Sequence, residues 1–203
     1  MSSTAIRTGH YTFDDFLLLV EEHEKADLLD GVIYMASPES TDDNELGGWL
    51  YALMRQFAEE TDQGKCYYTR VAFRITDKRG PEPDVAFVAK QRLHIVQRGF
   101  VNGPPDIAVE IVSPDSAQRD YDLKRNIYES AGVKEYWIID PEDQRATFLR
   151  LQGEQFVEVN PQGGRFESQV LWGFSLKIEW LWSNERPSLL AIFPEMLRGR
   201  GGA

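Results

Sequence analysis

The sequence predicts a single α/β domain, and two patterns carry this prediction. The middle of the chain holds an apolar run at 107–112, a helical pattern at about 119–131 and a second apolar run at 136–139, which together indicate a strand, a helix and a strand. The helical pattern ends at Gly132, a residue type typical of helix C-termini. We therefore expect two parallel strands joined by a right-handed crossover. The second pattern predicts a hairpin before this unit in the sequence and a set of additional strands after it.

The N-terminal part is expected to form a helix, a hairpin and a longer helix. Apolar residues at helical spacing predict helices at 11–24, with Thr12 in the N-cap region, and from the N-cap residues at 40–43 to about Glu60. Both apolar stripes indicate faces packed on a core rather than binding surfaces. The dipeptide Asp30-Gly31 is a strong turn signal and predicts a hairpin within 26–35.

Further strands are expected on both sides of the central unit. The predicted strands lie at 67–75, 82–88, 146–151, 156–159, 166–170 and 174–178. We expect one domain over 1–203, with a core at about 13–151, a C-terminal β extension at about 152–182 and a flexible tail at 198–203. Trp172, Trp180 and Trp182 are expected to be packing residues.

The composition excludes several classes of protein. The net charge of -11 and the pI near 4.8 argue against a general polyanion binder, although a local basic surface remains compatible with them. The single cysteine, Cys66, excludes an intrachain disulfide framework and fits a reducing compartment. No apolar run of membrane-spanning length and no signal-peptide pattern stands out. We expect a soluble, cytoplasmic protein without a membrane segment.

Two carboxylates lie in or next to apolar strand patterns. Glu110 interrupts the run 107–112, and Asp84 begins the run 84–88. A carboxylate inside an apolar strand must be paired, bound to a metal or neutralised if it faces a dry core. The alternative is that Glu110 lies on the solvent-facing side of a half-exposed strand. The repetition of the pattern favours a shared site for the two acids.

A lysine on the following helix could complete this site. Asp120, Lys124 and Tyr128 are spaced by four residues and so share one helical face. If that face overlies the strand end, the Lys124 side chain can reach the carboxylates. Otherwise Asp120 and Lys124 form an ordinary surface ion pair that stabilises the helix by roughly a few tenths of a kcal/mol. Two carboxylates with a lysine are suited to hold Mg²⁺ and to activate water at a phosphate.

The clearest basic cluster lies elsewhere in the chain. Lys90, Arg92, His94 and Arg98 follow the strand at 82–88. A solvated loop is the simple interpretation. If a polyanion binds, Lys90, Arg92 and Arg98 are the expected contacts.

These motifs together resemble a known family. The segments PEPDVAFV, PPDIAVEIVSPDS and RDYDLKRNIYESAGVKEYWIID, with the hairpin DLLDGVIYMASPES, closely resemble the Uma-two family of endonucleases in the PD-(D/E)XK nuclease superfamily. The resemblance covers roughly 13–151. It implies a restriction-endonuclease-like core, with a mixed central sheet flanked by helices.

The resemblance also implies residue roles. Asp84 and Glu110 match the metal-binding acids, and Lys124 matches a catalytic lysine that has moved from the strand to the next helix. A family histidine near the start of the long helix has no counterpart here, where Asp43, Asn44 and Glu45 stand instead. We expect accessory roles for Asn44, Glu45 and Asp120.

The expected function is hydrolysis of DNA phosphodiester bonds by an endonuclease that depends on Mg²⁺, or on Mn²⁺ in its place. Two alternatives stay open at this point: a catalytically inactive, nuclease-like binding or assembly module, and a hydrolase of small phosphoesters. Cleavage of both strands would suit a homodimer, although nothing in the sequence specifies an interface.

Overall fold

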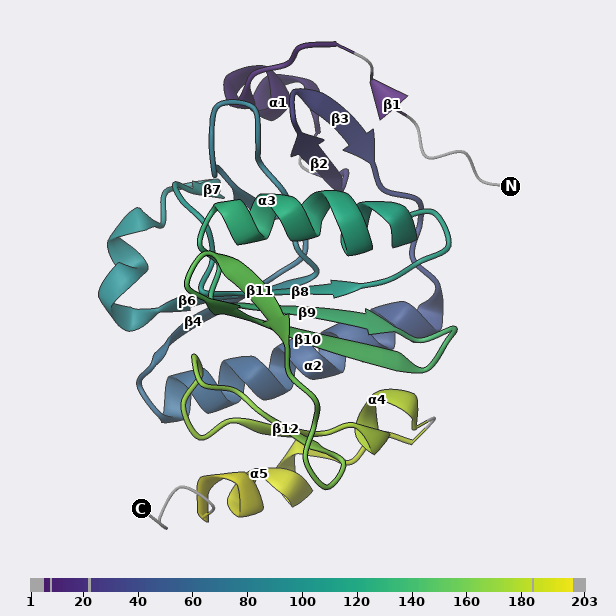
Figure 1. Cartoon of the computed structure of the whole chain (residues 1–203), viewed down its shortest axis with the longest axis vertical. Coiled ribbons are helices and arrows are strands. Elements are labelled where there is room, and N and C mark those ends of the chain that lie inside the picture. Colours follow the sequence, from purple (N-terminus) through teal and green to yellow (C-terminus); the bar gives the residue numbers. More distant parts are fainter. Residues whose placement is uncertain (1–5, 8, 22, 184, 199–203) are drawn as a thin grey trace.

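A six-stranded mixed sheet forms the centre of the molecule (Figure 1). The computed structural model describes residues 6–7, 9–21, 23–183 and 185–198. The sheet has the order β11-β10-β9-β8-β6-β4. Its strands are β4 (Gly64–Tyr68), β6 (Val85–Ala89), β8 (Ile107–Ile111), β9 (Glu135–Asp140), β10 (Arg145–Gln152) and β11 (Gln155–Glu158). The expected parallel pair is confirmed, since β8 and β9 are parallel and the other neighbours antiparallel.

Helices cover both faces of this sheet (Figure 1). The long helix α2 (Thr41–Glu60) packs on one face, and its N-cap Ser40 accepts a hydrogen bond from the Asp43 backbone N–H. The crossover helix lies on the other face and has two parts: a π-helical segment η2 (Arg119–Lys124) and the α-helix α3 (Arg125–Ser130). The sequence predicted one continuous α-helix here, so the π-helical start is a correction.

The N-terminal elements form a small antiparallel sheet with a helix beside it. They are β1 (Ile6–Arg7), α1 (Phe13–Leu19), β2 (Ala26–Leu29) and β3 (Val32–Met35). Thr12 and Asp15 make a reciprocal capping box at the start of α1, which is shorter than predicted. The hairpin turn is confirmed, since Asp30 and Gly31 have φ angles of 50° and 82°, as a tight hairpin turn requires.

The hairpin is attached to the segment that leads into β6. Leu28 and Gly80 exchange two backbone hydrogen bonds, at 3.1 Å and 2.8 Å. This contact joins parts of the chain that are about fifty residues apart. It places the N-terminal end of β2 beside the start of β6.

The predicted strand at 67–75 is interrupted. Thr69 and Arg70 have φ angles of 33° and 51°, a conformation that cannot continue a strand, so the chain leaves β4 and forms the short β5 (Ala72–Phe73). β5 pairs in parallel with β7 (Phe100–Val101). Lys90, Arg92 and His94 of the basic cluster lie in a 3₁₀ helix, η1 (Lys90–Ile95), rather than in an irregular loop, and Arg98 follows this helix.

The C-terminal part contains helices as well as strands. After β12 (Arg165–Glu167) and β13 (Ser175–Lys177), the chain forms α4 (Glu179–Trp182) and α5 (Leu189–Arg198). These elements pack on the side of the sheet that α2 covers (Figure 1).

Trp180 is buried, but Trp172 is 56% exposed, so the predicted packing role of Trp172 is wrong. The predicted tail beyond Arg198 lies outside the described residues. No helix in the described ranges is both long and apolar enough to span a membrane.

Candidate active site

Glu110 lies near the C-terminal end of β8 and is buried. Its side chain is 2% exposed, so the solvent-facing alternative for this residue is wrong. One carboxylate oxygen, Oε2, accepts a hydrogen bond from the Lys124 ammonium at 2.9 Å, and Oε1 accepts one from the Tyr128 hydroxyl at 2.8 Å. Both partners come from the crossover helix. The burial of this acid is therefore offset by a charged partner and a hydroxyl donor.

Asp84 stands beside Glu110 because of the strand register. β6 and β8 are antiparallel with Val85 opposite Val109, so the residue before Val85 lies next to Glu110 at the same end of the sheet. Oδ2 of Asp84 accepts a hydrogen bond from the Ile111 backbone N–H at 2.6 Å. Oδ1 forms an ion pair with the Lys25 ammonium. The β8 backbone thus fixes the Asp84 carboxylate in place.

Lys124 is enclosed by three carboxylates. Its ammonium lies 2.9 Å from Asp27, 2.9 Å from Glu110 and 3.5 Å from Asp120, and its side chain is 4% exposed. The interpretation of Asp120 and Lys124 as a surface pair is therefore wrong. Both residues belong to the π-helical segment, a geometry frequent at functional sites.

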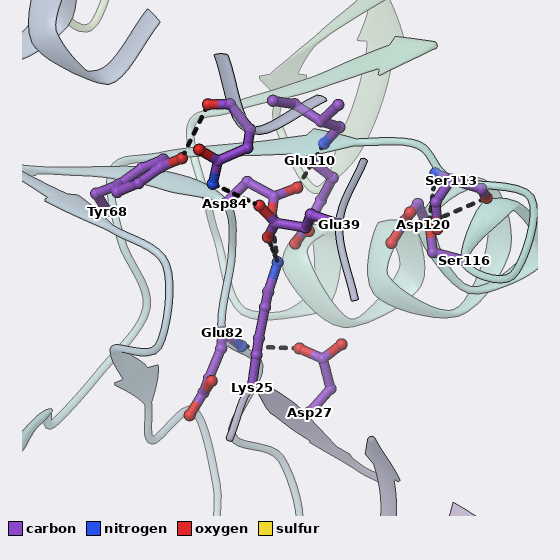
Figure 2. Close-up of polar contacts among 12 residues, drawn as sticks. Lys25, Asp27, Glu39, Tyr68, Glu82, Asp84, Glu110, Ser113, Ser116 and Asp120 are labelled. Atoms are coloured by element: carbon purple, nitrogen blue, oxygen red, sulfur yellow. Dashed lines mark hydrogen bonds and ion pairs between the residues drawn. The ribbon is translucent and has the colours of Figure 1, made fainter. Parts of the chain in front are cut away.

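Three further charged residues approach this cluster, and the sequence did not identify them as members of the site. Lys25 precedes β2, Asp27 lies within β2, and Glu82 precedes β6 (Figure 2). Asp27 accepts a hydrogen bond from the Glu82 backbone N–H at 2.8 Å. Asp27 has the same sequence pattern as Glu110, a carboxylate inside an apolar strand, and this pattern could have predicted it as a site residue. Lys25 and Glu82 flank strands and carried no such signal.

Burial and like charges shift the pKa values of these groups. Burial raises the pKa of Glu110, and the carboxylates of Asp120, Asp84 and Asp27 raise it further, against the Lys124 ammonium. Burial also raises the pKa of Glu82, to about 8. Burial alone would lower the pKa of Lys124, but its carboxylate neighbours outweigh burial and hold that pKa well above its usual value. Lys124 is therefore a permanent cation at neutral pH.

The charged cluster opens into one cavity of about 570 Å³. Asp84, Glu110 and Lys124 line it together with Lys25, Asp27 and Asp120. The structure thus brings the three principal predicted residues, and the accessory Asp120, to one place. Glu39, Tyr68 and Arg119 also line the cavity.

The two other predicted accessory residues do not line this cavity. Asn44 and Glu45 are exposed in the first turns of α2. Asn44 is connected to the cavity through Glu39, to which its side-chain amide donates a hydrogen bond at 3.1 Å. The accessory roles of Asn44 and Glu45 stay predictions.

The predicted nucleic-acid contacts lie at the other end of β6. The strand separates Asp84 from Lys90, which at the usual rise per residue is roughly 20 Å. Lys90 pairs with Asp62, and Arg92 lies 3.0 Å from Asp106 and donates to the Pro104 carbonyl at 2.8 Å. Arg98 is exposed. Nucleic-acid binding by this cluster stays a prediction, and the cluster does not contribute to the cavity.

The donor set of the cavity fits a hard divalent cation. The carboxylates of Asp27, Asp84, Glu110 and Asp120 face the ammonium groups of Lys25 and Lys124, which leaves a formal charge of -2 when all are ionised. Asp120 Oδ1 is buried without a hydrogen bond. Oxygen ligands of this kind suit Mg²⁺ or Mn²⁺. Within the described part of the chain, however, no group of three such side chains is arranged to hold a metal ion, and Asp27, Glu110 and Asp120 converge on the Lys124 ammonium instead.

Comparisons with known proteins agree with the fold and with a nuclease family. No curated protein matches the sequence. A crystal structure described as a putative nuclease from Anabaena variabilis is similar, with a TM-score of 0.72 and 18% identity over 84% of this chain and 97% of that chain. At this identity the likeness supports the mixed α/β, nuclease-like fold. The model of the Uma2 family, described as "Putative restriction endonuclease", matches residues 13–179 and supports a nuclease. A match over this much of the sequence shows that the chain belongs to the Uma2 family.

Proposed function

We propose that this protein is a metal-dependent endonuclease that hydrolyses phosphodiester bonds in DNA. The observation that carries the proposal is the convergence of Asp84, Glu110 and Lys124, from three separate elements, on one cavity. Structural ion pairs seldom leave several carboxylates facing an open cavity with too few cations, because buried charge without a partner is costly. The same arrangement suits a site that takes up a cation and a phosphate.

Asp84 and Glu110 are the proposed ligands of Mg²⁺, or of Mn²⁺ in its place. A bound ion of this kind polarises a phosphate oxygen and lowers the pKa of water. The protein's own contribution is to orient the two acids. The Ile111 N–H fixes Asp84, and the Tyr128 hydroxyl fixes Glu110.

Lys124 acts in this proposal as a fixed positive charge. Its raised pKa keeps it protonated, so it cannot take a proton from water at neutral pH. As an ammonium it can instead hold the attacking water by hydrogen bonding and offset the negative charge that develops on the phosphate. Asp27 and Asp120 hold the ammonium at this point.

Plasmid cleavage tests the proposal. The purified protein should cut DNA with Mg²⁺ or Mn²⁺ and should lose this activity with EDTA. Glu110→Ala should abolish cutting, and Glu110→Gln, which keeps the side-chain shape, should lower it by at least about 10²-fold, because an ionic ligand is lost. Glu154→Ala, which removes an exposed carboxylate between β10 and β11, is the matched control and should cut normally. Cleavage that is unchanged in Glu110→Ala would reject the assignment.

One observation favours a second candidate, a hydrolase of small phosphoesters. The cavity volume of about 570 Å³ lies in the range usual for small-molecule sites, and acids such as Glu39 and Asp43 line it beside the core cluster. Such surroundings repel a polyanion more than a single phosphate. Turnover of nucleotides or of a model diester, without cleavage of any DNA, would favour this candidate.

An inactive binding or assembly module would give a third result. Neither DNA nor small esters would be cleaved, and calorimetry would detect no Mn²⁺ binding that depends on both Asp84 and Glu110. A homodimer that cuts both strands stays a prediction, and gel filtration with light scattering would test it.

A further inference from the structure

Lys25 is a second lysine of the cavity, at a position that bears directly on cation binding. It lies just before β2, and its side chain is 19% exposed. Its ammonium forms the ion pair with Asp84 Oδ1 and lies 3.7 Å from Glu39 (Figure 2). Burial and the nearby Lys124 charge act to lower the pKa of Lys25, but the carboxylates of Asp84 and Glu110 outweigh them and raise it, so the group is charged.

The ion pair with Lys25 occupies the Asp84 carboxylate oxygen that a cation would need. Oδ2 of Asp84 is engaged by the Ile111 N–H, and Oδ1 is engaged by Lys25. A divalent cation could bind this carboxylate with full effect only in place of the ammonium, because two positive groups on one oxygen repel each other. Lys124, already held by three carboxylates, is not free to move in the same way.

The Lys25 ammonium has a second possible partner nearby, the carboxylate of Glu39. Glu39 also lines the cavity, and its side chain is 34% exposed. The Lys25 backbone is fixed to the hairpin, since its carbonyl accepts a hydrogen bond from the Ala36 N–H at 2.9 Å. Rotation of the flexible four-carbon stem is therefore enough to carry the charge from Asp84 to Glu39.

We propose that Lys25 is an internal counter-ion of Asp84 that a divalent cation displaces toward Glu39. The proposal rests on the proposed function, because it assumes that Asp84 is a ligand. The exchange weakens cation binding, since part of the binding free energy is spent on breaking the ion pair between Lys25 and Asp84. It also accounts for the orientation of the Asp84 carboxylate toward the Lys25 ammonium.

Calorimetry with Mn²⁺ tests the exchange without reference to cleavage. Lys25→Met removes the competing charge and should bind Mn²⁺ at least tenfold more tightly than the unaltered protein, whereas Lys25→Arg keeps the charge and should bind with nearly the original affinity. Lys134→Met is the matched control, because Lys134 is ion-paired with the buried Asp106 at 2.9 Å outside the cavity, and it should leave the affinity unchanged. Thermal unfolding of each variant establishes that it is folded.

The outcomes separate the two proposals. If the unaltered protein binds Mn²⁺ through Asp84 and Lys25→Met binds it no more tightly, the exchange is rejected and the proposed function stands. If neither protein binds Mn²⁺, both proposals fail. Binding by Lys25→Met alone would support the exchange strongly.

A measurement on the unaltered protein covers the case in which Lys25→Met does not fold. Titration with Mg²⁺, followed by NMR of the lysine side-chain ammonium groups, should move the Lys25 signal with the midpoint of ion binding. The signal can be assigned by its absence in Lys25→Arg, and the Lys134 signal should not move. A Lys25 signal that stays in place while Mg²⁺ binds would overturn the proposal.

Discussion

The two ends of strand β8 each hold a buried acid with cationic partners, but their charge balance differs. At the N-terminal end, Asp106 is fully buried and is paired with Arg92 and Lys134, and it accepts a hydrogen bond from the Ala89 N–H. These partners outweigh burial and lower the pKa of the Asp106 carboxyl. At the C-terminal end, Glu110 shares its cations with other acids, and its pKa is raised.

This difference separates a structural ion cluster from a candidate active site. Asp106 faces more positive charge than it carries, and no cavity among those described is lined by it. The Glu110 cluster has more carboxylates than ammonium groups and lines a cavity. A shifted pKa alone would identify both ends of β8 as candidate sites. The direction of the shift, together with the cavity, identifies the Glu110 end as the candidate active site.

The largest contrast is expected for the two lysines. Lys124→Met leaves three carboxylates facing one another in the interior and should lower the free energy of unfolding by about 3–5 kcal/mol, besides abolishing DNA cleavage. Lys134→Met removes a half-exposed partner of Asp106 and should cost less than about 1 kcal/mol. Urea unfolding of both variants measures the difference. Equal losses would contradict the comparison.

Neutral substitutions of the two acids should affect the free energy of unfolding differently. Asp106→Asn replaces a charge that the fold favours and should lower the free energy of unfolding by about 2–3 kcal/mol. Glu110→Gln replaces a charge that the fold disfavours and should leave stability unchanged or raise it at about pH 8, while activity falls. A strongly destabilised Glu110→Gln would show that this acid has a structural role like that of Asp106.

Stability should depend on pH through the raised pKa of Glu82. The folded protein holds this proton up to about pH 8, whereas the ordinary pKa is 4.5. The stabilisation is therefore complete below the ordinary pKa and is lost as the pH rises toward the folded value. Between about pH 5 and about pH 7 the free energy of unfolding should fall by about 2 kcal/mol from this group. Glu82→Gln should reduce the slope, and an unchanged slope would assign it to other groups.

The last expected effect is on ion binding rather than on stability, and it concerns the pH dependence of cation affinity. Because the pKa of Glu110 is raised, a bound cation must displace a proton at neutral pH. Mn²⁺ affinity should rise by up to about tenfold per pH unit between about pH 6 and about pH 8. Calorimetry in buffers of different ionisation enthalpy would count the released protons. Affinity that does not change with pH would mean that Glu110 is already ionised or does not bind the ion.

The sequence predicted the parts of the site that follow from local patterns. Asp84 and Glu110 interrupt or begin apolar runs, and Lys124 lies on the helical face that the crossover turns toward β8. Strand register then brings these groups together. The hairpin at Asp30 and the capping of α1 by Thr12 were predicted for the same reason, since each depends on neighbouring residues alone.

The remaining features depend on contacts between distant segments. Lys25 and Asp27 reach the cavity because Leu28 is hydrogen-bonded to Gly80, a pairing with no local signal. The helix α5 was missed because Pro194 interrupts its pattern, although Ile192, Phe193 and Met196 are buried on the α2 side of the sheet. Trp172 was assigned to the core by residue type, but the turn that carries it faces solvent.

Diffraction from crystals soaked in Mn²⁺ would show whether Asp84 and Glu110 bind a cation, because the anomalous signal locates the ion independently of activity. We expect a peak in the cavity between the carboxylates of Asp84 and Glu110, absent from crystals of Glu110→Gln. A well-bound peak elsewhere on the protein, or no peak at Mn²⁺ concentrations that support cleavage, would contradict it.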